Sequence, residues 1–241
     1  MKFRTIKILF ILIIFSCSSK KVINGKLVSG NKLNGITKEF YKNGDIKLKW
    51  NYKNGKLSGI SKEYNKNGTL KANWKYENNK LNGISKNFIE NGTYSEWKYE
   101  NGKLLEGYSF YKSGEIFEKY NFKEGKKSGN AFRFYETGEK EIIWNFENDF
   151  LLSGIGYYQT GEKKFDYKYK NGIPEGITVE YYKTGEKKME WNYEDNKLQG
   201  ISTEYLKNGN KKVEWNYKNG ILSGKSIEYY ENGNTKRILN Y

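Results

Sequence analysis

The chain has 241 residues, of which 36% are hydrophobic, 17% are aromatic and 29% are charged, and its formal net charge is +15. This composition is too polar for a protein with several membrane spans and too aromatic for a disordered chain. With no histidine and a single cysteine, Cys17, the chain lacks the residues for an internal disulfide, a His-based triad, a His/Cys zinc site or a Cys-ligated cluster. We therefore expect no catalytic residue, no metal and no cofactor.

The first residues predict export. Lys2, Arg4 and Lys7 precede the apolar run 8–15, which is far shorter than the roughly 18–20 residues that span a bilayer. The Ile-Phe-Ser-Cys segment that ends at Cys17 resembles a bacterial lipobox, in which the cysteine is diacylated and becomes the mature N-terminus. We expect a lipoprotein signal peptide (a signal helix) at 1–16, lipidation of Cys17, and anchoring in the bacterial cell envelope, facing the periplasm or the exterior. An ordinary signal peptide or an uncleaved anchor is the alternative.

The remainder is one unit repeated. A tether and partial repeat at 17–34 precede about nine repeats of about 24 residues at 35–241. The glycines that open the units are Gly35, Gly59, Gly83, Gly107, Gly129, Gly154, Gly176, Gly200 and Gly224. In this alignment the units at Gly107 and Gly154 have 22 residues, and the missing residues fall in the first arm. A fixed period of this length indicates a repeat array in which neighbouring units bury a shared core.

Each unit predicts two strands and two turns. Asn-Gly occurs twelve times, and flanked by alternating apolar residues it is a strong hairpin signal. We therefore predict an all-β fold, an elongated array of antiparallel β-hairpin repeats that forms a single-layer twisted sheet. The second turn of each unit is less clear, and we expect a bulge or kink near Gly59 and its equivalents, at a position left open.

The first turn suggests a register. A three-residue loop at 42–44 with a left-handed Gly44 pairs Phe40 with Ile46 and Ile36 with Trp50. On the opposite face the same rule predicts charge pairs that fix the register. These are Glu39 with Lys47, Glu63 with Lys71, Arg133 with Glu141, Glu180 with Lys188, Glu204 with Lys212 and Glu228 with Lys236, and one unit pairs Asn87 with Ser95.

All six tryptophans follow a first turn, in Trp-Asn-Tyr or a variant of it. The column comprises Trp50, Tyr52, Trp74, Tyr76, Trp97, Tyr99, Tyr120, Phe122, Trp144, Phe146, Tyr167, Tyr169, Trp191, Tyr193, Trp215 and Tyr217. A spacing of two places both rings of a unit on one face of a strand. Two interpretations stay open, since the column is either the core of a thin array or a ligand-binding aromatic face.

The repeated pattern, typified by GISTEYLKNGNKKVEWNYKNGILS from Gly200, resembles the MORN-repeat variant of bacteria. The resemblance extends from Gly35 to Tyr241. It implies an elongated antiparallel sheet, protein scaffolding and association with phospholipid, and it brings no catalytic residues. Proteins of this appearance are often described as YwqK-type antitoxin components of toxin–antitoxin systems.

These observations favour a membrane-tethered, non-catalytic lipoprotein that acts as a protein-binding or scaffold module for an unidentified protein partner. One alternative is an antitoxin or immunity protein whose partner is a toxin, and another is a module that binds anionic phospholipid through its lysines. Binding of nucleic acid is not expected, because the chain is exported and its lysines alternate with glutamates instead of forming a dense block.

Overall fold

The computed structural model describes residues 21–23, 26–89 and 92–241. The predicted signal helix and Cys17 lie outside these residues. Within the described part, the regular elements are all β-strands, and no helix there is long and apolar enough to cross a membrane.

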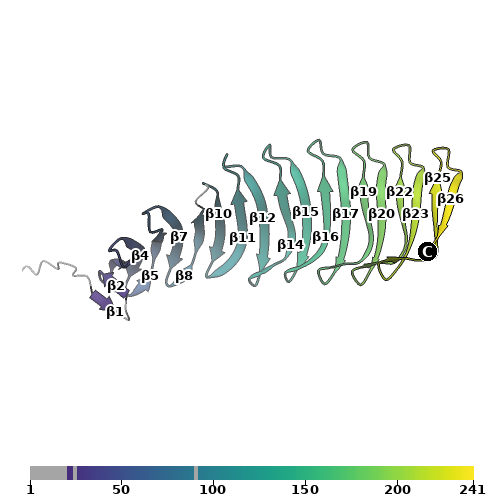
Figure 1. The fold of residues 1–241 in the computed structure, drawn as a ribbon. Helices are drawn as coiled ribbons and strands as arrows, with labels where there is room; N and C mark the ends of the chain where they lie inside the picture. The colour runs from purple at the N-terminus through teal and green to yellow at the C-terminus, as the bar shows by residue number, and fades with distance from the viewer. Residues whose placement is uncertain (1–20, 24–25, 90–91) are drawn as a thin grey trace, which may run out of the picture.

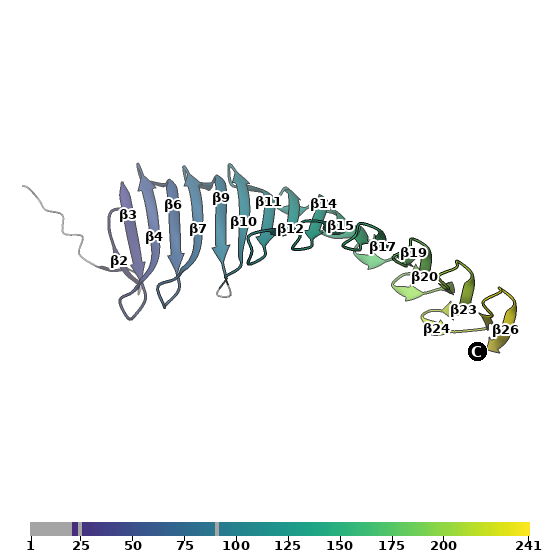
Figure 2. The same cartoon turned by 90° about the horizontal axis from the view of Figure 1, so that it is seen from above.

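The 26 strands form one antiparallel sheet in which strands pair with their neighbours along the chain. Figure 1 shows an elongated array of curved strands, and Figure 2 shows that the strands near the N-terminus are seen broadside while those near the C-terminus are seen edge-on. The sheet therefore twists along its length, as strands normally do. This confirms the predicted all-β array of hairpin repeats in one open twisted sheet.

The strands fall into four kinds. An N-terminal pair consists of β1 (Lys21–Ile23) and β2 (Lys26–Ser29). First-arm strands are β3 (Gly35–Phe40), β6 (Gly59–Tyr64), β9 (Gly83–Phe88), β14 (Gly129–Phe134), β19 (Gly176–Tyr181), β22 (Gly200–Tyr205) and β25 (Lys225–Tyr229). Long second-arm strands are β4 (Ile46–Lys53), β7 (Leu70–Glu77), β10 (Tyr94–Glu100), β12 (Ile116–Lys123), β15 (Lys140–Glu147), β17 (Lys163–Lys170), β20 (Lys187–Glu194), β23 (Lys211–Lys218) and β26 (Thr235–Asn240). Short returning strands are β5 (Lys56–Leu57), β8 (Lys80–Leu81), β13 (Lys126–Lys127), β18 (Ile173–Pro174), β21 (Lys197–Leu198) and β24 (Ile221–Leu222), whereas β11 (Lys103–Phe110) and β16 (Phe150–Tyr157) join a returning strand to the next first arm.

The first turn has the predicted form. Tyr41 N donates to Asp45 O at 2.8 Å and Gly44 N donates to Tyr41 O at 3.0 Å, so that three residues form the loop. Gly44 has φ of 91°, a conformation that glycine adopts without steric penalty. Phe40 then pairs with Ile46, as predicted.

Beyond that pair the predicted register is wrong by one residue. Lys47 forms a bulge, so Glu39 pairs with Leu48 and Ile36 pairs with Asn51, not with Trp50. The same shift recurs after the first turn of most units, for example between Glu63 and Tyr64. Each bulge places two residues opposite one, which moves the unit's isoleucine to the face opposite the tryptophans. The Gly83 unit has no such shift, and there Asn87 pairs with Ser95 as predicted.

The second turn is a two-residue hairpin. Asn54 and Gly55 both have positive φ, of 50° and 73°, and Lys53 pairs with Lys56, as in a type I′ turn. Ser58 N then donates to Asn51 O at 2.9 Å, and Gly59, with φ of 85°, begins β6. This confirms the kink expected near Gly59 and places it at 58–60.

Two units replace this kink with a continuous strand. Gly107 pairs with both Trp97 and Tyr120, and Gly154 pairs with both Trp144 and Tyr167. Ser61, not the unit-opening Gly59, pairs with a tryptophan in a regular unit. The assignment of Gly107 and Gly154 as unit-opening glycines is therefore wrong, and so is the placement of the missing residues in the first arm. These units keep the two-residue second turn but lack one residue of the segment that forms the kink after it, and their first arms have full length.

The sheet is too thin to have a conventional core. The buried apolar residues among those described are Ala72, Ala131 and Val179. Most aromatic side chains are half-buried, so stability depends on contacts between neighbouring repeats, as in other repeat arrays.

Candidate functional site

One face of the sheet, the tryptophan face, holds the predicted aromatic column. Trp50 and Trp74 stack with ring centroids 6.0 Å apart, and Tyr120 and Trp144 stack at 6.2 Å. Trp97 contacts Phe122 at a tilted angle, with centroids 6.3 Å apart. The stacked rings cover part of one another's flat faces. Where rings stack in this way, the column is part of the packed interior and does not offer an exposed ring face to a ligand.

Small residues lie beneath the rings. Ser61, which is 0% exposed, pairs with Trp74, and its Oγ accepts a hydrogen bond from Asn51 N at 3.3 Å. Ala131 pairs with Trp144 in the same way. At Gly107 an added Cβ would lie 2.7 Å from the Trp97 ring. The sequence pattern did not reveal this row of small residues, because it is defined by its neighbours on adjacent strands.

Four of the predicted charge pairs are ion pairs, but they lie on this face and not, as predicted, on the face opposite the tryptophans. Lys71 and Glu63 are 2.9 Å apart, Lys188 and Glu180 2.9 Å, Lys212 and Glu204 2.8 Å, and Lys236 and Glu228 2.8 Å. The lysine occupies the bulge, where its side chain still reaches the glutamate. The hydrogen bond to Glu204 raises the pKa of Lys212.

The other two predicted charge pairs do not follow the pattern. Glu39 accepts a hydrogen bond from Trp50 Nε1 at 2.9 Å, and Lys47 Nζ lies 5.8 Å from the centroid of the Tyr41 ring. Arg133 does not pair with Glu141; its guanidinium lies 2.7 Å from Glu118.

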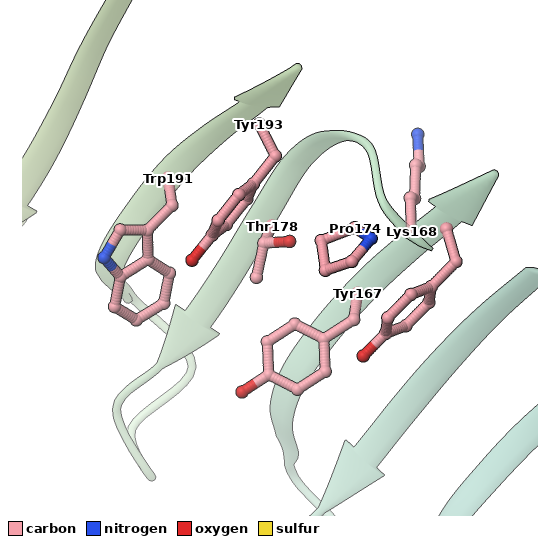
Figure 3. Close-up of a pocket in the computed structure, with 7 residues that line it drawn as sticks. Tyr167, Lys168, Pro174, Thr178, Trp191 and Tyr193 are labelled. Atoms are coloured by element: carbon pink, nitrogen blue, oxygen red, sulfur yellow. The ribbon is translucent and has the colours of Figure 1, made fainter. Parts of the chain in front are cut away.

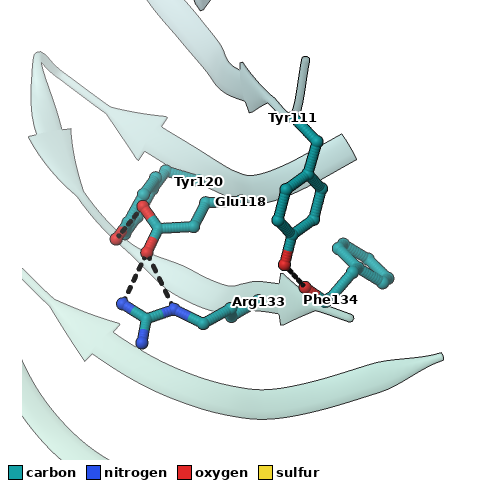
Figure 4. A network of polar contacts seen from close by, with 5 residues as sticks. All are labelled: Tyr111, Glu118, Tyr120, Arg133 and Phe134. Carbon is teal, nitrogen blue, oxygen red and sulfur yellow. Dashed lines mark hydrogen bonds and ion pairs between the residues drawn. The ribbon is translucent and has the colours of Figure 1, made fainter. Parts of the chain in front are cut away.

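Figure 4 shows the contact between Arg133 and Glu118. Glu118 lies directly opposite Arg133 on the neighbouring strand β12, a position where other units have Leu48 or Ala72. The same carboxylate accepts a hydrogen bond from the Tyr120 hydroxyl at 3.1 Å. Burial, together with the Glu118 charge, raises the pKa of Tyr120 to about 12.

Tyrosines after the first-arm strands tie successive repeats together. Tyr111 Oη donates to Phe134 O at 2.8 Å, as seen in Figure 4. Equivalent bonds join Tyr41 to Tyr64, Tyr135 to Tyr157, Tyr158 to Tyr181 and Tyr182 to Tyr205. Asn65, Ile89 and Leu206 occupy the same position in other units and have no phenol to donate.

The opposite face, which we call the isoleucine face, has a row of exposed apolar side chains. The isoleucines that directly follow a unit-opening glycine on this face are Ile36 (53% exposed), Ile60 (53%), Ile84 (48%), Ile177 (49%) and Ile201 (57%). Across the early strands they alternate with polar residues, since Ile36 pairs with Asn51 and Ile60 with Lys75. Exposed apolar residues gathered in this way mark an interaction site more often than scattered ones do.

In the first three repeats the isoleucines lie among lysines. We call this group the basic isoleucine patch; it comprises Ile36, Ile60, Ile84, Lys38, Lys49, Lys62 and Lys75. Lys49 lies directly between Lys38 and Lys62 on adjacent strands. Among the described residues, none of these four lysines forms an ion pair. A shallow hollow of about 180 Å³ lies here, lined by Ile36, Lys49, Ile60, Lys62 and Tyr64 among others.

Near the C-terminus the same face has compensated charge. We call Ile177 and Ile201 with their neighbouring ion pairs the paired isoleucine patch. Lys187 lies 2.6 Å from Glu190, and Lys211 lies 2.5 Å from Glu214. The two glutamates occupy the strand positions that Lys49 and Asn73 hold in the early repeats.

The tryptophan face has a hollow between β17 and β20. This hollow of about 350 Å³ is lined by Tyr167, Lys168, Tyr169, Pro174, Thr178, Trp191 and Tyr193, as Figure 3 shows. Burial raises the pKa of Tyr167 and of Tyr169. Within residues 21–23, 26–89 and 92–241, His, Cys, Asp and Glu form no group of three or more that could hold a metal ion.

Comparison with a family model matches four segments of the chain. The model of the MORN repeat variant matches residues 33–54, 174–195, 198–219 and 222–241. No curated protein matches the chain. Among solved structures, virginiamycin B lyase from Staphylococcus aureus is 12% identical, with 93% of this chain and 84% of that chain covered and a TM-score of 0.19. A streptogramin B lyase is 14% identical, with 90% and 79% covered and a TM-score of 0.20. TM-scores this low support no argument about this chain, whereas the four matched segments identify MORN-variant repeats, a kind of module suited to binding a protein or a membrane.

Proposed function

We propose that this chain is a non-catalytic lipoprotein of the bacterial cell envelope, tethered through Cys17, that binds a protein partner through its isoleucine face. The observation that carries the proposal is the basic isoleucine patch. Three isoleucines about half exposed lie beside a run of lysines that oppose one another on adjacent strands. Apolar area favours a lasting contact, and the surrounding charge favours an acidic partner.

The lysine run has a physical cost that binding relieves. Like charges directly opposite on paired strands are destabilising, and Lys49 has such a neighbour on each side, Lys38 and Lys62. A carboxylate-rich surface that covers the three ammonium groups removes this repulsion. The patch therefore has more to gain from an acidic partner than a face whose charges are already paired.

The shape of the sheet suits an extended contact. Equivalent residues in consecutive repeats lie two strands apart, or about 9.6 Å, and the three isoleucines of the patch span three such units. A partner with an elongated acidic and apolar surface would meet all three at once. Two observations support a binding role over an enzymatic one. The chain has no histidine, which excludes His-based catalytic sites, and the hollow at Ile36 and Ile60 is open and shallow.

The same patch supports a second candidate, binding of anionic phospholipid. Each lysine near an anionic membrane contributes about 1 kcal/mol, and exposed isoleucines suit the boundary between headgroups and acyl chains. A tether at Cys17 would hold the first repeats close to that surface. Salt should weaken this association strongly, because screening acts on the lysines.

One experiment separates the two candidates. The chain, tagged after Tyr241, is captured from native membranes, and in parallel is floated with vesicles with and without phosphatidylglycerol. Replacing Ile36 and Ile60 with Asp should abolish capture of a single stoichiometric protein, whereas replacing Ile177 and Ile201 with Asp should not. Vesicle binding without any protein partner would support the phospholipid candidate and contradict the first proposal.

Two further controls address the tether and the antitoxin alternative. A Cys17→Ala variant should leave the membrane fraction, and its retention there would contradict lipid anchoring. If the captured partner kills cells when produced alone, the module is an antitoxin or immunity protein. A harmless partner would instead favour a scaffold.

A further inference from the structure

We infer that the hollow on the tryptophan face is a binding slot for one uncharged sugar ring of an oligosaccharide. This site lies on the face opposite the basic isoleucine patch and goes beyond the function proposed above. Its residues come from three neighbouring strands, β17, β19 and β20, with the short strand β18 at one end.

Two aromatic walls face each other across the slot. Tyr167 and Tyr169 belong to β17, and Trp191 and Tyr193 belong to β20, with Thr178 of β19 between them. The walls are therefore two strands apart, about 9.6 Å at the backbone. A flat ring that contacts an aromatic carbon on each side at about 3.5 Å needs about 7 Å between the two walls, so one ring fits.

At two other places on the same face such a space is closed. Trp50 and Trp74 are also two strands apart, yet their centroids lie 6.0 Å from each other, above Ser61. Tyr120 and Trp144 close to 6.2 Å above Ala131. Between Tyr167 and Trp191 the floor residue is Thr178, whose side chain is bulkier than that of Ser61 or Ala131, and a hollow of about 350 Å³ remains.

The chemistry of the lining indicates what the slot would accept. Lys168 is the one charged residue of the lining, and Figure 3 shows its side chain directed away from the rings. None of the hydrogen bonds among the described residues uses the hydroxyl of Tyr167, Tyr169 or Tyr193. Flat apolar walls with unused hydroxyls at their ends suit a pyranose, which has apolar C–H faces and a rim of hydroxyl groups. A charged ligand would gain no partner here, and a purely aromatic one would leave the hydroxyls unused.

The test is calorimetric titration of the full chain with three neutral oligosaccharides, cellohexaose, maltohexaose and chitohexaose, and with p-cresol as the aromatic probe. We expect at least one oligosaccharide to bind saturably with one-to-one stoichiometry. Tyr167→Ala and Trp191→Leu should each weaken it about tenfold or more, because each removes one wall. Thr178→Ser, which lets the walls approach as they do above Ser61, should also weaken it.

Trp74→Leu is the matched control, because Trp74 occupies the equivalent place in a closed stack. It should leave oligosaccharide binding unchanged, and circular dichroism checks that each variant keeps its sheet. Equal loss in Trp74→Leu and Trp191→Leu, no saturable binding of any of the three oligosaccharides, or binding of p-cresol in their place would each overturn the inference. The Ile36→Asp and Ile60→Asp changes should have no effect on this titration, which keeps the slot separate from the isoleucine face.

Discussion

The early repeats and the repeats at Gly176 and Gly200 follow the same sequence pattern, yet their isoleucine faces differ in charge. Early repeats place Lys38, Lys49 and Lys62 opposite one another without acidic neighbours among the described residues. Late repeats place Glu190 and Glu214 at the positions that Lys49 and Asn73 hold in the early repeats, and each glutamate is held by a lysine three residues earlier. The backbone and the exposed isoleucines are common to both, so the fold does not require the lysine run. The comparison shows that the early repeats retain an unfavourable arrangement of lysines, although the same fold accommodates paired charges in the late repeats.

Charge reversal should distinguish the two patches most strongly. We expect Lys38→Glu together with Lys62→Glu to weaken binding to phosphatidylglycerol vesicles or to an acidic partner by a hundredfold or more. The reason is that each lysine contributes about 1 kcal/mol near an anionic surface, and reversal also adds repulsion. Lys187→Glu together with Lys211→Glu alters the net charge equally and should have little effect. Equal losses in a flotation assay would show that only net charge matters and would remove the distinction between the patches.

The two regions also differ on the tryptophan face, closed above Ser61 and open above Thr178. Ser61→Thr should insert a methyl group between Trp50 and Trp74 and destabilise the chain by about 1–3 kcal/mol, as overpacking does. Chemical denaturation measures this loss, and near-ultraviolet circular dichroism reports the separation of the rings.

Ser61→Ala is the control for that change. It removes the hydrogen bond from Asn51 N but keeps the rings together, as above Ala131, so its near-ultraviolet spectrum should not change. A Thr variant that is as stable as the wild type would show that the rings at this place are not tightly packed.

The tyrosine ties provide a smaller difference between the regions. Tyr182→Phe removes the bond to Tyr205 O and should lower the free energy of unfolding by about 0.5–1.5 kcal/mol. Asn65→Tyr in the early repeats should add an equivalent bond to the next unit and raise stability by a similar amount. If Tyr182→Phe leaves the denaturation midpoint unchanged, the ties orient the tyrosines without stabilising the array.

The sequence predicted features that depend on neighbouring residues in the chain better than features that depend on contacts between strands. Turn chemistry is local, so Asn-Gly predicted both turns and the left-handed Gly44, and the hairpin array followed. The register failed at a single bulged residue, Lys47, because a bulge conserves the alternation on either side of it and leaves no separate mark in one sequence. That one residue moves Ile36 to the face opposite Trp50, so the isoleucine face was not predicted.

Other contacts were not predicted because the sequence pattern does not identify the second group in each contact. The tyrosine ties end on backbone carbonyls, which any residue provides. Arg133 forms its ion pair with Glu118 of the neighbouring strand, and this contact depends on the register of the two strands. The slot at Tyr167 and Trp191 depends on whether two rings lean together or apart, and the aromatic column alone leaves that choice open.

The smallest effect concerns stability in the lysine run itself. Lys49→Glu places a carboxylate between Lys38 and Lys62 and converts two like-charge contacts into two attractive ones, as Lys86 and Glu96 already form at 2.6 Å in the next repeat but one. Cross-strand pairs of this kind are worth about 0.2–1 kcal/mol each, so the variant should unfold at a slightly higher denaturant concentration, and the gain should shrink in high salt. Glu190→Lys, the reverse change in the late repeats, should lose a similar amount because Lys187 then loses its partner. A variant at Lys49 that is more stable but binds less would show that the early repeats keep their lysines for an external surface. A less stable variant would mean that the repulsion is weaker than the contact that Lys49 Nζ makes with the Tyr64 ring, whose centroid is 5.0 Å away.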